Sequence, residues 1–193
     1  DMLAQLNAVF GKMENKLVLS LGLDNRTSSN ELKHYMEELA KLTDKLSIKL
    51  EENVDAAEAP YVRVCREDGS FSGLAFHGIP GGHEFTSFIL GLYNVAGPGQ
   101  QIEEDTKAKI QAVDKDTKIK IMVSLTCTMC PDLVVAAQRI ASLSPKVITE
   151  VYDLNHFPDL RDKYQIMSVP CMVIDDGKPN FGKKDINQVL DLI

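Results

Sequence analysis

The sequence contains only four cysteines among its 193 residues, and no apolar run approaches the roughly 20 residues that a membrane-spanning helix needs. No signal peptide is visible. So few cysteines do not make a disulfide framework, and we therefore expect a reducing compartment, the cytoplasm. Positive charge is scarce, because 21 lysines and arginines stand against 28 aspartates and glutamates, for a net charge of −7. This balance argues against nucleic acid or an anionic membrane as a partner.

The remaining composition is that of a globular protein. Apolar residues make up 44% of the sequence, which is enough for a packed core. The length fits either one large domain or two small ones. The sequence opens with Asp1-Met2 and stops directly after a helical pattern, as a fragment excised from a longer protein would.

The spacing of apolar residues predicts alternating helices and strands. Predicted helices cover residues 1–15, 28–42, 83–95, 102–113, 132–143, 157–164 and 185–193. Predicted strands cover residues 17–21, 46–50, 60–65, 71–76, 119–125, 147–152, 171–174 and 178–181. We therefore expect an α/β protein.

The order of these elements repeats once along the chain. The strand at 17–21 aligns with residues 121–125, and Pro60 aligns with Pro170 at the start of a later strand. The repeat is too long for a solenoid and predicts two tandem α/β domains, residues 1–96 and 97–193.

A Cys-x-x-Cys pair, Cys127 and Cys130, stands between a predicted strand and a predicted helix. Unpaired N–H groups and the helix dipole favour a thiolate there, so the pKa of Cys127 should lie below the free-thiol value of about 8.5. We expect Cys127 to be the exposed attacking sulfur at the loop-to-helix junction. Cys130 should be the shielded resolving sulfur, one turn inside the helix. Together they could form a redox disulfide.

Other interpretations of the cysteines are weaker. Zinc needs four ligands, usually a second Cys-x-x-Cys pair or two closely spaced histidines, and neither is present. Cys65 and Cys171 lie in separate apolar strands, where packing is their expected role. In the first unit, Leu23 and Arg26 align with the two active cysteines. The first unit therefore resembles a redox-inactive copy.

Two sets of motifs connect this sequence to known proteins. The Cys-x-x-Cys pair and the later Ser168-Val169-Pro170 resemble the thioredoxin/glutaredoxin superfamily. Gly82-His83-Glu84-Phe85-Thr86-Ser87 and the segment 124–132 resemble the N-terminal domain of alkyl hydroperoxide reductase F. The resemblance covers essentially the whole chain. It implies two tandem thioredoxin-like folds, of which only the second is redox-active.

The resemblance also implies a function. Members of that family are thiol–disulfide oxidoreductases. They relay electrons from a flavoprotein that resembles thioredoxin reductase to a peroxiredoxin. They thus serve peroxide detoxification, cell redox homeostasis and the response to reactive oxygen species. FAD and NADH or NADPH are expected on a C-terminal flavoprotein portion in cis, through which a dimer could form. No cofactor is expected in this chain, because residues 78–82 lack the spacing and the strand-to-helix context of a dinucleotide-binding motif.

Further site residues follow from the same resemblance. A cis Val169–Pro170 bond would face the dithiol and present the backbone as a docking edge for a partner strand. Glu84 would lie near the dithiol and move protons for Cys130. The alternative for Glu84 is an acidic residue that only favours the first turn of a helix.

The chain departs from the family pattern at two places, which leaves several functions open. Thr128-Met129 replaces a more polar pair between the cysteines, and Cys171 replaces a small residue after Pro170. One alternative is a stand-alone protein disulfide oxidoreductase of glutaredoxin type. Another is a non-catalytic docking or metal-binding module, although His77 and His83, in a predicted glycine-rich loop, lack a matching ligand set.

Overall fold

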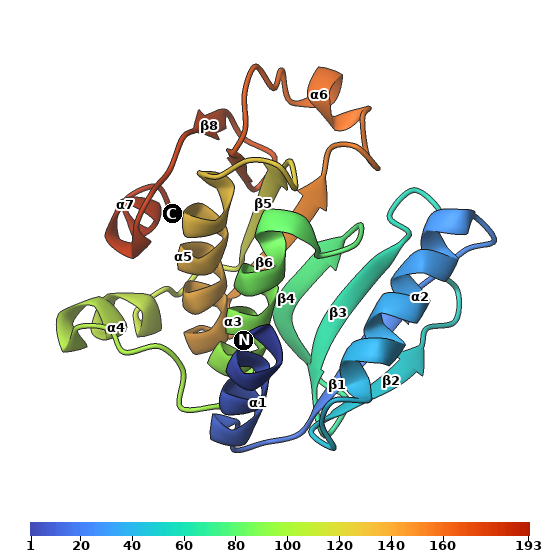
Figure 1. Cartoon of the computed structure of the whole chain (residues 1–193). Helices are drawn as coiled ribbons and strands as arrows, with labels where there is room; N and C mark the ends of the chain where they lie inside the picture. Colours follow the sequence, from blue (N-terminus) through green and yellow to red (C-terminus); the bar gives the residue numbers. More distant parts are fainter.

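The expected alternation of helices and strands is present in a computed structural model, which describes all 193 residues (Figure 1). The strands are β1 (Leu17–Gly22), β2 (Leu46–Leu50), β3 (Tyr61–Arg66), β4 (Phe71–His77), β5 (Thr117–Val123), β6 (Val147–Asp153), β7 (Cys171–Ile174) and β8 (Pro179–Phe181). The helices are α1 (Met2–Lys12), α2 (Thr27–Ala40), α3 (Phe85–Ala96), α4 (Glu104–Gln111), α5 (Cys130–Leu143), α6 (Leu160–Lys163) and α7 (Ile186–Leu190). A short 3-10 helix, η1 (Gly82–Glu84), leads into α3. None of the helices has the length and apolar character that crossing a membrane requires.

All eight strands belong to one sheet, in the order β2-β1-β3-β4-β6-β5-β7-β8. In each half the first strand pairs parallel with the second and antiparallel with the third, and the third pairs antiparallel with the fourth. The internal repeat therefore extends from the sequence to the strand order. The halves are joined by a parallel pairing of β4 with β6.

Helices α3 and α5 reinforce this junction, because they pack against each other over the strands that meet there. Figure 1 shows α3 and α5 side by side in front of the sheet. Alternate residues of the strands point to opposite faces. The main core, which includes Ile121, Val151 and Met172, lies under the helices. A smaller cluster on the opposite face contains Met122, Tyr152 and Cys171 and is closed by the α6 segment.

A partly buried polar network also crosses the junction. His77, at the end of β4, lies 2.9 Å from Glu150 Oε1 on β6 through its Nε2, and its Nδ1 lies 2.8 Å from the Glu58 carbonyl. Lys118 lies 2.9 Å from the other Glu150 oxygen, and the Tyr152 hydroxyl donates to the Glu58 carboxylate at 2.8 Å. The prediction that His77 lies in a glycine-rich loop was wrong, because pairing with β6 extends β4 by one residue to include it.

We expect Glu150→Gln to destabilise the protein by about 3 kcal/mol at pH 7. Burial alone would raise the pKa of Glu150, but hydrogen bonds from His77 and Lys118 outweigh it and lower this pKa from 4.5 to about 2. A pKa difference of about 2.5 corresponds to about 3 kcal/mol. Because the folded-state pKa is depressed, the contribution is present above about pH 4.5 and is lost as the pH falls towards 2.

Urea unfolding of the unmodified protein and of the Glu150→Gln protein between pH 2 and 7 measures this difference in the free energy of unfolding. Glu67→Gln is a suitable control, because Glu67 is exposed to solvent in the turn that follows β3. Equal stability of the Glu150→Gln and Glu67→Gln proteins at pH 7 would show that the network contributes nothing.

Candidate redox site

The loop that carries Cys127 follows β5 directly. It runs from Ser124 to Met129, and its first turn is held by a hydrogen bond from the Cys127 N–H to the Ser124 carbonyl at 3.0 Å. Two details of the prediction were wrong. The strand ends at Val123 rather than Leu125, and Cys130 is the first residue of α5 rather than one turn inside it. Pro131 explains the second, because proline suits the first turn of a helix and needs no N–H partner there.

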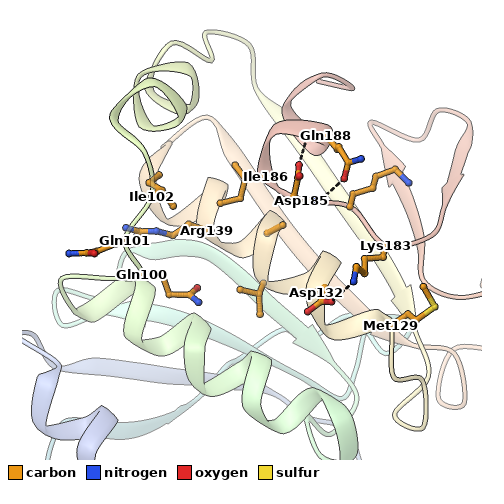
Figure 2. Close-up of a pocket in the computed structure, with 13 residues that line it drawn as sticks. Gln100, Gln101, Ile102, Met129, Asp132, Arg139, Lys183, Asp185, Ile186 and Gln188 are labelled. Atoms are coloured by element: carbon orange, nitrogen blue, oxygen red, sulfur yellow. Dashed lines mark hydrogen bonds and ion pairs between the residues drawn. The ribbon is translucent and has the colours of Figure 1, made fainter.

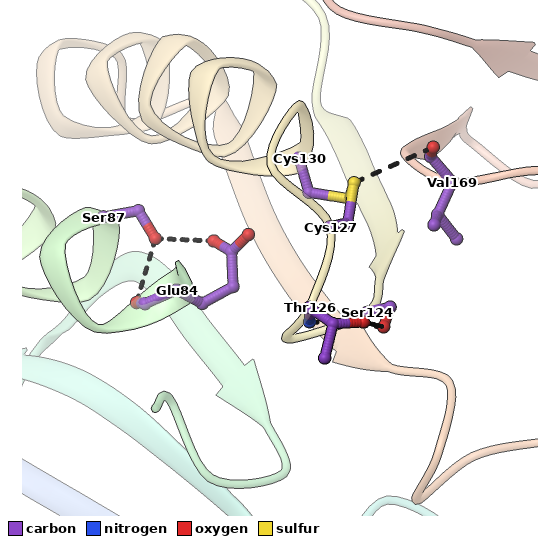
Figure 3. The surroundings of a disulfide bond; sticks show 7 residues. All are labelled: Glu84, Ser87, Ser124, Thr126, Cys127, Cys130 and Val169. Carbon is purple, nitrogen blue, oxygen red and sulfur yellow. Dashed lines mark hydrogen bonds between the residues drawn. A yellow bond between two sulfur atoms is a disulfide. The ribbon is translucent and has the colours of Figure 1, made fainter. Parts of the chain in front are cut away.

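Cys127 and Cys130 form a disulfide in this structure, with their Cα atoms 5.6 Å apart (Figure 3). The two sulfurs differ in access. Cys130 is fully buried and belongs to the main core, whereas Cys127 is partly exposed. A large partner can therefore reach Cys127 first, and Cys130 lies behind it.

The segment before β7 forms the opposite side of the site. The Val169 carbonyl oxygen lies 3.9 Å from Cys127 Sγ, as Figure 3 shows. The predicted cis Val169–Pro170 bond is confirmed, and the aligned Ala59–Pro60 bond of the first unit is also cis. The backbone of Val169 is thus placed beside the accessible sulfur.

The first unit contacts the cysteine loop directly. The His83 N–H donates to the Leu125 carbonyl at 2.9 Å. Gly82 allows this approach, because its φ is +52° and a Cβ there would lie 2.8 Å from the same Leu125 oxygen. This contact places η1 and the start of α3 against the redox loop, residues 124–129.

Glu84 lies at this contact and is completely buried. Its Oε1 accepts a hydrogen bond from the Ser87 hydroxyl at 2.5 Å, whereas Oε2 is buried without any partner. Burial raises the pKa of Glu84 to about 7, against a lowering influence of the Ser87 hydrogen bond. Figure 3 shows the side chain extending from the end of η1 towards the loop that carries Cys127. A carboxyl group with such a pKa can both accept and release a proton near neutral pH.

Sequence reasoning missed Ser87 as the partner of Glu84. Its position three residues after Glu84 was the available signal, because side chains at this spacing share one face of a helix.

The histidines are not grouped with other potential metal ligands. His83 is exposed, and His77 makes hydrogen bonds to the Glu58 carbonyl and the Glu150 carboxylate. No cluster of three or more histidine, cysteine, aspartate or glutamate side chains that could hold a metal ion is present.

The other two cysteines are buried thiols, Cys171 with no exposed surface and Cys65 with 7%. Burial raises the pKa of both, that of Cys171 to about 11.

In the reduced protein we expect iodoacetamide to label Cys127 at least about three hundredfold faster than Cys171 at pH 7. A pKa near 11 leaves about one Cys171 thiolate in ten thousand, whereas a pKa below about 8.5 leaves at least about three Cys127 thiolates in a hundred. Peptide mapping over time measures these rates. Equal labelling of Cys171 and Cys127 would contradict a packing role for Cys171.

The tandem α/β units, with a disulfide-forming Cys-x-x-Cys pair at the start of a helix and a cis-proline beside it, define a thioredoxin-fold protein of the thiol–disulfide oxidoreductase class. A family model described as "Thioredoxin domain" matches residues 117–190. The crystal structure of the NTD_N/C domain of alkylhydroperoxide reductase AhpF from Enterococcus faecalis superimposes with a TM-score of 0.93 at 37% identity, over 99% of this chain and 97% of that one.

Two other comparisons agree with this match. Alkyl hydroperoxide reductase F from Pseudomonas aeruginosa is 30% identical over 190 residues, which is 98% of this chain and 36% of that protein. A protein disulfide oxidoreductase from Aeropyrum pernix shares the fold, with a TM-score of 0.84 at 19% identity over 100% of this chain and 90% of that one. The chain thus belongs to the alkyl hydroperoxide reductase F family, in its N-terminal domain, and spans about a third of the length of such curated relatives.

Proposed function

We propose that this domain relays electrons from a flavoprotein dithiol to the disulfide of a peroxiredoxin in the cytoplasm. The observation that carries the proposal is the arrangement of the two sulfurs. Cys127 is accessible beside the Val169 backbone, and Cys130 is fully buried behind it. The membership in the alkyl hydroperoxide reductase F family supports the choice of partners.

The proposed reaction has two exchanges. The Cys127 thiolate attacks one sulfur of the partner disulfide, and the other partner sulfur leaves as a thiolate and takes up a proton. Cys130 then loses its proton and attacks Cys127 Sγ. The second partner sulfur leaves as a thiol, so two electrons have passed to the partner. The product is the Cys127–Cys130 disulfide that the structure contains.

The partner segment is proposed to bind along Val169 and Pro170 in extended form. An exposed backbone edge can pair with such a segment as an added strand. The Val169 carbonyl lies only 3.9 Å from Cys127 Sγ, so a strand bound there would bring its own disulfide to the reactive sulfur.

The first unit, residues 1–96, is proposed to act as a platform for the second, residues 97–193. Its helix α3 ends at Ala96, and its segment around Gly82 and Glu84 contacts the redox loop. We propose that Glu84 takes the proton of Cys130 during resolution. A raised pKa near 7 and the unpartnered Oε2 support this role.

The source of the electrons is proposed to be a flavoprotein portion in cis, with FAD and NADH or NADPH. The curated relatives are about three times as long as the matched region, which leaves room for such a portion in them.

The test is a comparison of two reductants for the oxidised domain. One is a thioredoxin-reductase-like flavoprotein with NADH or NADPH, and the other is glutathione. We expect reduction by the flavoprotein and onward transfer to an oxidised peroxiredoxin, with Cys171→Ser as a control that retains both activities. Reduction by glutathione alone would instead support a stand-alone oxidoreductase of glutaredoxin type.

A further inference from the structure

The seven methionines fall into two groups by exposure. Four are buried to 1% exposure or less, namely Met13, Met36, Met122 and Met172. Three are exposed, Met2 at 66%, Met129 at 52% and Met167 at 83%. An exposed methionine places a flexible, polarisable apolar side chain in water, and such side chains are used at adaptable binding surfaces.

Two of the exposed methionines belong to the two segments that form the redox site, one to each segment. Met129 lies between Cys127 and Cys130, directly before α5, and lines one end of a cavity of about 660 Å³ that continues along α5 (Figure 2). Met167 precedes Val169 by two residues, and the Val169 carbonyl lies 3.9 Å from Cys127 Sγ. Met2 is distant from both segments in the sequence, at the start of α1.

We propose that Met129 and Met167 are a modification site at which hydroperoxides oxidise the thioether sulfur to the sulfoxide and thereby slow disulfide exchange with a protein partner. This inference rests on the proposed function of the dithiol. It adds a direct reaction of the domain with the class of oxidant that the relay would help to remove.

The chemistry needs no further reactant. A lone pair of the thioether sulfur attacks the terminal oxygen of the hydroperoxide, an S–O bond forms and the O–O bond breaks. The alkoxide that leaves takes the peroxide proton and becomes an alcohol. Sulfur is oxidised by two electrons and the peroxide is reduced by two. Methionine sulfoxide is reversible through sulfoxide reductases, so the change could be undone.

The effect follows from the polarity of the product. A partner strand bound beside Val169 would cover the exposed thioethers, and burying a methionine side chain contributes favourably to association. The sulfoxide is polar and loses this contribution. We expect exchange with a protein disulfide to slow by about tenfold, which corresponds to about 1.4 kcal/mol.

The experiment begins with the disulfide form, in which Cys127 and Cys130 are protected from the oxidant. The protein is treated with tert-butyl hydroperoxide, and peptide mapping follows the gain of one oxygen at each methionine. We expect oxidation of Met2, Met129 and Met167, with the four buried methionines as internal controls. The treated protein is then reduced and mixed with an oxidised peroxiredoxin or with a small aromatic disulfide.

Two variants separate the contributions, each compared with its own untreated sample. Met2→Leu should show the full loss after treatment, because it leaves the two site methionines in place. Met129→Leu with Met167→Leu should show no loss after treatment. The small disulfide should react at the same rate before and after treatment in every protein, because it needs only the sulfur and not the surrounding surface.

Two results would overturn the inference. One is oxidation of Met129 and Met167 no faster than that of the buried methionines. The other is an unchanged rate with the peroxiredoxin once both sulfoxides are present. A failure of the untreated protein to reduce the peroxiredoxin would instead refute the proposed function and with it the docking role, while the peptide map still decides whether the two sites are oxidised.

Discussion

Replacement of Cys127 by serine should abolish reduction of a peroxiredoxin disulfide, with a loss of at least about a thousandfold in rate. A hydroxyl cannot replace the thiolate that attacks the partner disulfide. Replacement of Cys130 by serine should have a different result. The Cys127 thiolate would still attack, but the mixed disulfide would persist because the resolving sulfur is missing. Non-reducing electrophoresis and mass spectrometry identify this covalent complex, and stopped-flow measurements give the rate.

The different access of the two sulfurs explains why these effects should not be symmetric. Cys130 has no exposed surface, so it cannot serve a protein partner when Cys127 is absent. Cys171→Ser is the matched control, since it also removes a fully buried thiol but leaves the dithiol intact. An undiminished rate for the Cys127→Ser protein would mean that the assignment of the attacking sulfur is wrong.

Replacement of Glu84 by glutamine should slow the resolution step by about a hundredfold at pH 8, within the range of positioned acid–base groups. Glutamine has a similar shape but cannot take the Cys130 proton. In the unmodified protein, the rate of mixed-disulfide resolution should rise as the pH passes through about 7, because burial raises the pKa of Glu84 to that value. Stopped-flow traces from pH 5.5 to 9 should show this midpoint, and the Glu84→Gln protein should lack it.

Folding stability offers an independent readout of the same group. Because its folded-state pKa is raised from 4.5 to about 7, the neutral carboxyl is favoured in the folded protein. This contribution is fully present below about pH 4.5 and is lost as the pH rises through 7, by about 3 kcal/mol for a pKa difference of about 2.5. The Glu84→Gln protein should not show this loss. Its sign is opposite to that expected for Glu150, whose pKa is depressed.

Ser87→Ala is the control that keeps the carboxyl group in place. The Ser87 hydrogen bond opposes the effect of burial on the pKa of Glu84, so its removal should move the midpoint of resolution to higher pH. If Glu84→Gln and Ser87→Ala both leave the pH profile unchanged, Glu84 has no part in proton transfer and only packs at the junction.

The sequence by itself determined the elements and their repeat. Strands such as 46–50 and 171–174 have the same bounds in the structure, because apolar alternation in the first, a continuous apolar run in the second, and the flanking turn residues act locally. The Cys-x-x-Cys pair was also evident, since its chemistry depends on a spacing of three residues. The cis Val169–Pro170 bond could be predicted only through the resemblance to a family, because cis bonds are rare even before proline.

The tertiary structure alone decided what the two halves do to each other. Pairing of β4 with β6 joins residues far apart in the sequence and brings His77 to Glu150. Complete burial of Glu84 likewise depends on the approach of η1 to Leu125. Burial and pKa are properties of the surroundings on every side, so a pattern along one segment cannot give them. The exposure of Met129 and Met167 belongs to the same class of information, since apolar residues are ordinarily expected inside.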